Sequence, residues 1–156
     1  MTVEETQDPI ERLLEKPYCL IDILPYQVPA DAKGQYFSIE QYFLQPEERM
    51  RLAKKFARLV LRLNCYAEIV TVCLPDDTST RNAAPAQLEA WVKACVSAEQ
   101  TDIQTIYFLI PEADAMIALC QDDTYMTLYN PNAHLRQLVA QLAMAEGLFV
   151  WDKQDI

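Results

Sequence analysis

The sequence predicts an α+β fold, a two-layer sandwich in which helices pack mainly on one face of a mixed β-sheet of about five strands. Three observations carry this prediction. Segments with helical periodicity are interspersed with short β-rich segments along the chain. The second half contains consecutive strand-like segments, which indicate a meander. The strands are also too polar, and the parallel crossovers too few, for a doubly wound sheet with helices on both faces.

The length and composition fit one globular unit. We expect residues 1–156 to form a single domain, because 156 residues is an ordinary domain size. A hydrophobic content of 51% argues against disorder, and only two glycines leave little material for glycine-rich phosphate loops. The acidic N-terminal residues and the absence of an apolar run of about 18 residues predict neither a signal peptide nor a membrane span.

Cysteine usage and charge narrow the class further. The five cysteines form no C-x-x-C pair, so we expect reduced, buried thiols, no metal site, no cofactor and a cytoplasmic location. The net charge of −10 disfavours nucleic acid and anionic membranes as partners, because phosphate repels an acidic chain. The remaining partner classes are another protein, a second copy of the chain or a small molecule.

The chain begins with a predicted helix and a predicted strand. Asp8 is placed to cap the helix, Pro9 suits its first position, and Glu11 completes a capping box. Pro17 ends this helix. The β-rich segment Tyr18 to Leu24 follows as a strand.

The segment from Ala30 to Leu44 fits two descriptions. Gly34 marks a turn, and Ser38 with Gln41 resembles the capping box of a short helix. The aromatic content of the segment fits an extended conformation equally well. The sequence leaves both open.

Residues 46–63 carry the clearest helical pattern. Pro46 and two glutamates occupy the first turn, where proline fits and negative charge favours the helix dipole, and Asn64 is a C-terminal cap. The expected buried face consists of Leu52, Phe56, Leu59, Val60 and Leu63.

The remaining elements follow from strand and turn signals. Asn130 is expected to cap the last helix, with Pro131 at its first position and Gly147 at its end. We expect strands at 67–74 and 106–110, a loop at 75–84, a helix from Pro85, a hairpin of 116–120 and 124–129, and an edge strand or plug at 148–151.

The sequence contains few groups suited to catalysis. His134 is the only histidine and is expected to face solvent, and no nucleophile-elbow, Walker or zinc-helix motif occurs. Asp122 and Asp123 suit a hairpin turn. Asp22 interrupts an apolar strand, and we expect it to face solvent on the open side of the sheet. These three aspartates are the candidates for a carboxylate-containing pocket.

The charge pattern is the most unusual feature. Residues 46–64 contain six basic and two acidic residues in a chain whose net charge is −10. The basic side chains share a broad helix face, which is either a solvated surface, paired within the chain, or a site for a twin subunit or an acidic partner. The candidate partner-binding residues on this helix are Arg51, Lys54, Lys55, Arg58 and Arg62.

Alternation along the strands predicts a second, tyrosine-rich sheet face. If Ile106, Phe108, Ile110, Met126 and Leu128 face the helices, then Tyr107, Leu109, Tyr125, Thr127 and Tyr129 face the other way, joined by Leu20, Asp22 and Leu24. Tyrosine is common at interfaces because an apolar ring carries a polar tip. We expect segment 30–44 or another chain to cover this face, with Tyr107, Tyr125 and Tyr129 as candidate contacts.

These observations favour a non-enzymatic protein-interaction or regulatory domain, comparable in composition with small inhibitor or immunity proteins, with a homodimer as one arrangement. The alternative is a small enzyme or ligand-binding protein with a pocket beside the sheet that uses Asp22, the Asp122–Asp123 turn or a cysteine. A concave pocket holding Asp22 and another titratable group would favour the alternative. A flat or convex tyrosine-rich face would favour the interaction domain.

Overall fold

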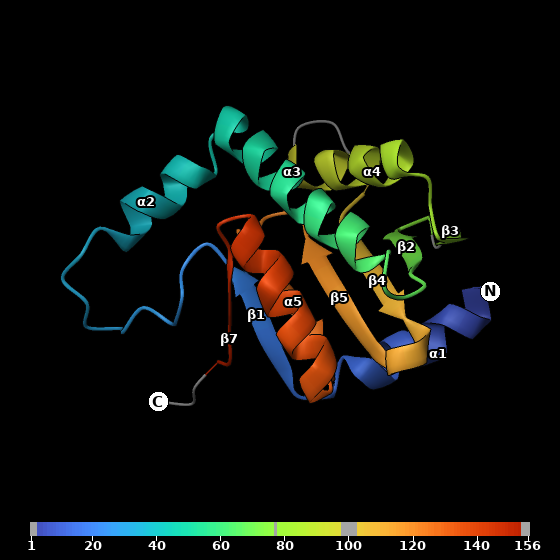
Figure 1. Cartoon of the computed structure of the whole chain (residues 1–156). Helices are drawn as coiled ribbons and strands as arrows, with labels where there is room; N and C mark the ends of the chain where they lie inside the picture. The colour runs from blue at the N-terminus through green and yellow to red at the C-terminus, as the bar shows by residue number, and fades with distance from the viewer. Residues whose placement is uncertain (1–2, 77, 98–102, 154–156) are drawn as a thin grey trace.

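The computed structural model describes residues 3–76, 78–97 and 103–153 and contains one seven-stranded sheet with helices (Figure 1). The strand order is β3-β2-β4-β5-β6-β1-β7, and every neighbouring pair is antiparallel. The predicted α+β class is confirmed. The predicted mixed sheet of about five strands is wrong, because two short edge strands extend it and all its strands run antiparallel.

The elements occur along the chain in the following order. They are α1 (Val3–Leu13), β1 (Tyr18–Asp22), α2 (Tyr36–Phe43), α3 (Pro46–Leu63), β2 (Val70–Leu74), β3 (Thr78–Arg81), α4 (Pro85–Ser97), β4 (Thr105–Ile110), the 3-10 turn η1 (Pro111–Ala113), β5 (Ala115–Cys120), β6 (Tyr125–Tyr129), α5 (Ala133–Ala145) and β7 (Phe149–Trp151).

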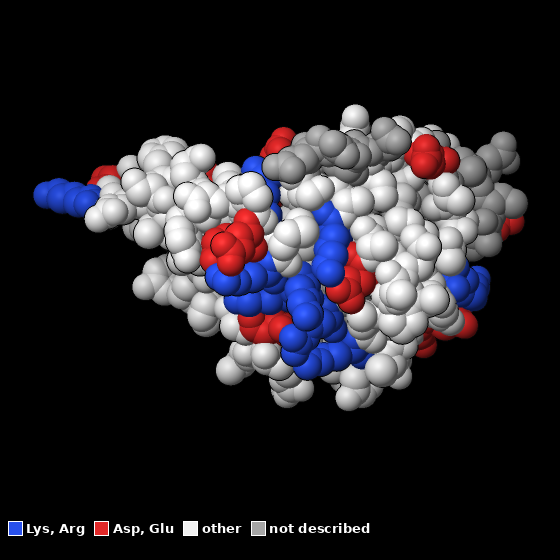
Figure 2. All heavy atoms as spheres, turned by 90° about the horizontal axis from the view of Figure 1, so that it is seen from above, with Lys and Arg blue, Asp and Glu red and all other residues white. Residues whose placement is uncertain are grey.

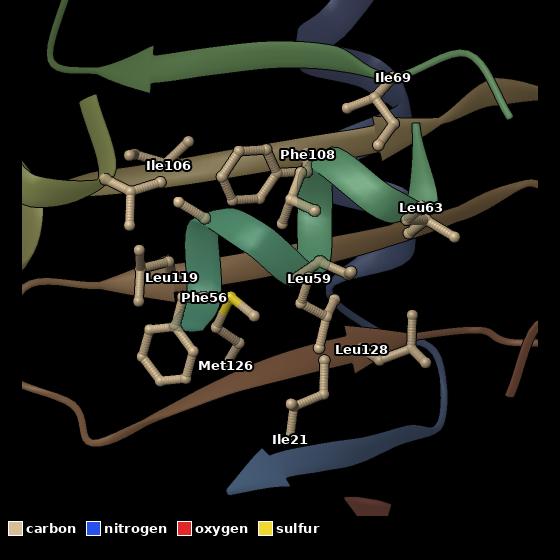
Figure 3. Close-up of a cluster of buried hydrophobic side chains, with 14 of the residues drawn as sticks. Ile21, Phe56, Leu59, Leu63, Ile69, Ile106, Phe108, Leu119, Met126 and Leu128 are labelled. Atoms are coloured by element: carbon tan, nitrogen blue, oxygen red, sulfur yellow. The ribbon is translucent and has the colours of Figure 1, made fainter. Parts of the chain in front are cut away.

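Helices α3, α4 and α5 cover one face of the sheet (Figure 1). The predicted stripe of α3 is fully buried, with Ala53 and Ala57 beside it. Figure 3 shows Phe56 and Leu59 of α3 projecting toward Phe108, Met126 and other apolar side chains of the strands. This layer is the main core. The strand side chains that point into it are those that the alternation along the sequence predicted.

The other face of the sheet has its own, smaller core under α1. Ile10 and Leu13 of α1 pack on Val70, Val72 and other side chains from the centre of the sheet. Leu109 and Met116 belong to the same cluster. Helices therefore lie mainly, but not entirely, on one face, because α1 covers half of the opposite one.

Helix α1 begins earlier than the capping signal predicted. It starts at Val3 and contains Pro9 in its interior. Thr6, Ile10 and Leu13 lie on one side of the helix at helical spacing, and all three are buried. Burial of this stripe outweighs both the local cap signal at Asp8 and the backbone hydrogen bond that a proline removes.

Two other local predictions are wrong for similar reasons. Residues 78–81 were expected in a loop but pair with β2 as an edge strand. The cap of α5 is Asn132, whose Oδ1 accepts a hydrogen bond from the Leu135 amide at 2.7 Å. Asn130 instead adopts a left-handed conformation (φ 57°) and donates its side-chain amide to the Asp114 carbonyl at 2.8 Å. Asn130 and Asn132 suit a helix cap equally well by local sequence, and contacts with distant residues decided which of them caps α5.

Residues 24–43, which we call the arm, lead out from the end of β1 and return into α3. Their helical half, α2, begins after Gln35 with no side-chain cap, so the helical description is correct and the capping box at Ser38 is wrong. Figure 1 shows the arm projecting from the body, and α2 contains no buried residue.

Among the described residues, no helix has both the length and the apolar character needed to cross a membrane.

Candidate interaction groove

An open hollow of about 830 Å³ lies between the arm and the half of the second sheet face that α1 leaves uncovered. We call it the arm groove. One wall is the arm itself, from Leu24 to Glu40. The opposite wall, the open half-face, consists of Tyr18, Leu20 and Asp22 of β1, Tyr125, Thr127 and Tyr129 of β6, and Trp151 of β7.

Strand register explains the composition of the open half-face. Leu20 lies between Thr127 and Trp151, and Asp22 pairs with Tyr125, so these side chains share one face. The tyrosine-rich second face therefore exists as predicted, but in two parts. Tyr107 packs beside the cluster under α1, whereas Tyr125 lines the arm groove.

Tyr129 lies where the two parts meet. It packs against the cluster under α1 and also lines the arm groove. Its ring lies 5.6 Å from that of Tyr18, measured between centroids. This pair forms the border between the covered and the open half of the sheet face.

Asp22 was expected to face solvent, but the structure buries it in the arm groove. The reason is that β7 pairs outside β1, so β1 is an inner strand. Its Oδ1 accepts a hydrogen bond from the Ile23 amide at 2.7 Å, and its Oδ2 accepts one from Trp151 Nε1 at 3.2 Å. Burial raises the pKa of Asp22, and these hydrogen bonds, with one from Leu24, oppose the rise. Both oxygens thus serve the chain's own donors.

The predicted Asp122–Asp123 turn joins β5 to β6 near the α2 end of the arm groove. Asp122 is exposed and Asp123 is half-buried. Burial raises the pKa of Asp123, and the negative charges of Asp122 and Glu40 raise it further. Burial, with the charge of Asp123, also raises the pKa of Tyr125 to about 12. This end of the groove is acidic, and neither aspartate of the turn lines it.

The arm wall presents large apolar side chains to solvent. Phe37 is 77% exposed and Tyr26 is 71% exposed. Tyr36, Ile39 and Tyr42 remain exposed by 42%, 45% and 49%. Sequence reasoning missed these residues as a surface, together with Tyr18 and Trp151. The available signal was the aromatic richness of a segment punctuated by Pro25, Pro29 and Gly34.

The basic face of α3 is largely paired within the chain. Arg58 and Arg62 both bind Glu146, whose carboxylate accepts at 2.8 and 2.9 Å. Arg51 binds Glu47 and Glu48 on its own helix. The ammonium group of Lys55 lies beside Gly147, just past the carboxyl end of α5, where a cation is favoured. Figure 2 shows these cations gathered in one patch with carboxylates among them.

Other candidates for chemistry are dispersed or unreactive. His134 is exposed in the first turn of α5, as expected. Cys19, Cys73 and Cys95 are buried, and burial raises the pKa of their thiols to about 11, 11 and 12, so they stay protonated. Cys65 and Cys120 are exposed, contrary to the expectation of burial. Across the described parts of the chain, no three metal-binding side chains gather.

Comparisons of the chain with protein-family models, characterised proteins and solved structures found no match.

Proposed function

We propose that the protein is a non-enzymatic interaction domain that binds another polypeptide through the arm and the arm groove. The observation that carries the proposal is α2, an eight-residue helix with five apolar or aromatic residues and no buried one. Exposed apolar surface of this extent on a folded chain marks an interaction site. Aromatic side chains with a polar tip, such as those of the groove, suit such sites.

The state of Asp22 argues against a catalytic use of the groove. A carboxylate that acts on a substrate must present an oxygen within reach of the proton or the electrophilic atom of that substrate. Both Asp22 oxygens already accept hydrogen bonds from Ile23 and Trp151. They tie the start of the arm and the edge strand β7 to β1, which is a positioning role for the groove walls.

A photo-crosslinking residue placed at position 37 in the native host tests the proposal. Position 66 is the matched control, because Tyr66 is 68% exposed but lies after α3, away from the arm. We expect a discrete crosslinked product from position 37 and none from position 66. A product at neither position, or equal products at both, would contradict a binding role for the arm.

A second candidate function is binding of a small molecule in the arm groove. The observation that favours it is the concave shape with Asp22, Tyr125 and Glu40 around it, which is the arrangement expected of the alternative. Native mass spectrometry of the gently purified protein tests it. A stoichiometric small molecule that is absent from a Thr127→Arg variant would support this candidate, and an empty protein would count against it.

The basic face of α3 stays a weaker candidate for a partner site. Because Arg58 and Arg62 hold Glu146, reversing their charge tests stability as much as binding. The double variant Lys54→Glu and Lys55→Glu leaves those ion pairs in place. If the face binds an acidic partner, this variant loses the crosslinked product of position 37, whereas a binding site confined to the arm keeps it.

A regulatory role of the inhibitor or immunity type, a cytoplasmic location and the exclusion of nucleic acid belong to the same proposal. Their support is the composition, with a net charge of −10 and five cysteines that form no C-x-x-C pair. Fractionation of the native host, with the protein followed by antibody, tests the location.

A further inference from the structure

We infer that the polypeptide bound by the arm is a second copy of this chain, with the aromatic side of each α2 inserted into the arm groove of the other copy. The inference rests on the proposed function and names its partner.

The exposed apolar area of the arm is large for a monomer. The five side chains Tyr26, Tyr36, Phe37, Ile39 and Tyr42 are each between 42% and 77% exposed. With roughly 200 Å² for a whole aromatic side chain, they present roughly 500 Å² to solvent. The largest apolar patch on a typical monomer is about 300–600 Å² and is often functional. The arm therefore has the size of a functional surface, which cover by another molecule would explain.

Reciprocal docking is what brings this area to the lower limit of a specific interface. Tyr26, Tyr36, Phe37 and Ile39 also line the groove, so the two surfaces overlap and only part of each arm is buried in a contact. One arm in one groove would then remove roughly 500 Å² from water, and two copies that exchange arms would bury roughly 1,000 Å², which is the lower limit for a specific complex. Such an exchange is isologous, so it closes at two copies and forms no fibre.

Charge does not oppose contact at the arm even though each copy carries −10. The twenty arm residues contain three charged side chains, Asp31, Lys33 and Glu40. Figure 2 shows the arm as mostly uncharged, in contrast to the patch at its foot. A copy of the same arm thus meets little like charge there, except at the acidic end of the groove beside Glu40 and Asp123.

The arm also has the length and position for exchange. It stands off from the body in Figure 1, on the side of the edge strand β7. Thirteen non-helical residues, 23–35, separate β1 from α2 and contain two prolines and Gly34. The groove holds about 830 Å³, which accommodates the side chains of one helix face but not a whole helix. The fitting occupant is the aromatic side of α2.

Light scattering and sedimentation over a concentration series test the inference on the full chain. We expect a dimer for the wild type. The arm variant Phe37→Ser with Tyr42→Ser should weaken the dimer at least tenfold in dissociation constant. The control variant Tyr66→Ser with Met144→Ser removes two side chains that are 68% and 72% exposed outside the arm, and should leave the constant unchanged.

A mixing experiment identifies the contact as arm-in-groove. The variant Thr127→Arg blocks the open half-face while keeping its own arm, and we expect it to be monomeric. Mixed with the arm variant, it supplies an intact arm to an unblocked groove, so a mixed dimer held by one of the two contacts should form, more weakly than the wild-type dimer, although neither variant dimerises alone. Recovery on mixing also demonstrates that both variants are folded.

Each outcome decides between the two levels of the proposal. A wild type that is monomeric at all concentrations, or a dimer that the arm variant leaves intact, overturns the second-copy inference. Crosslinking from position 37 to a different protein would then retain the interaction function with another partner. A monomeric wild type without any crosslinked product would remove both.

Discussion

Helix α1 is mostly polar but packs on the sheet, whereas helix α2 is mostly apolar but stays exposed. The sequence of α1 is mostly polar and charged, yet its apolar residues Ile10 and Leu13 are 8% and 1% exposed. The sequence of α2 is mostly apolar and aromatic, yet none of its residues is buried. Both flank the same tyrosine-rich face of the sheet. Hydrophobic content therefore did not decide which helix covers the sheet.

The difference lies in spacing and in anchoring. The apolar residues of α1 recur at positions that face one side, so a narrow stripe fits the centre of the sheet. Arg12 fixes the helix further, through two hydrogen bonds of 2.5 and 3.0 Å to the Asp114 carboxylate. The aromatics of α2 instead contact one another edge to face, in the neighbouring pairs Tyr36–Phe37 and Tyr42–Phe43. These contacts lie within the helix and do not tie it to the sheet.

The largest expected effect comes from the covered side. Replacing Leu13 by Ala should lower the free energy of unfolding by about 2–5 kcal/mol, because it leaves a cavity between α1 and the sheet. Denaturant titration measures this value. The loss should be independent of protein concentration, and a loss below about 1 kcal/mol would indicate that α1 does not hold its place in solution.

The border between the halves should give an intermediate effect. Tyr129→Ala should lower the free energy of unfolding by about 1–2 kcal/mol, because Tyr129 packs under α1 and against Tyr18. Its matched partner is Tyr125→Ala on the same strand, within the open groove, with a smaller expected loss. Equal losses in denaturant titrations of the two variants would remove the distinction between the halves.

A pH dependence should mark Asp22 on the open side. Its pKa in the folded chain is raised above the ordinary 3.8 by burial, so the folded state binds more protons than the unfolded state between these two values. The contribution of Asp22 is then fully present below pH 3.8 and is lost as the pH rises through the raised pKa. Relative to Asp22→Asn, the wild type should therefore lose stability over this window. Parallel pH profiles of the two proteins would contradict the burial of Asp22.

The smallest expected effect at low concentration is that of the arm. Phe37→Ser should change the free energy of unfolding by less than about 0.5 kcal/mol in dilute solution, because the side chain is 77% exposed. If the arm binds a second copy, the difference from the wild type should grow as the protein is concentrated, by mass action. Thermal melts over a hundredfold concentration range measure it. If the difference between variant and wild type does not change with concentration, Phe37 contributes to the stability of the single chain and not to association.

Prediction from sequence succeeded where a local pattern of apolar residues fits only one secondary structure. The stripe from Leu52 to Leu63 made α3 unambiguous, and the alternation from Tyr125 to Tyr129 assigned the two sheet faces. It failed where two residues were equally suited, as with the caps Asn130 and Asn132. It also failed at the edge strand 78–81, whose polar residues pair only because β2 lies beside them.

The sequence by itself determined the α+β class, the buried face of α3 and the tyrosine-rich second face, because the spacing of apolar side chains specifies periodic burial. Only the tertiary structure decided that α1 covers half of that face, that Arg58 and Arg62 meet Glu146, and that the arm borders an open groove. These outcomes depend on which distant segments meet. Local spacing specifies which side chains of a segment face inward, but not which segment they meet.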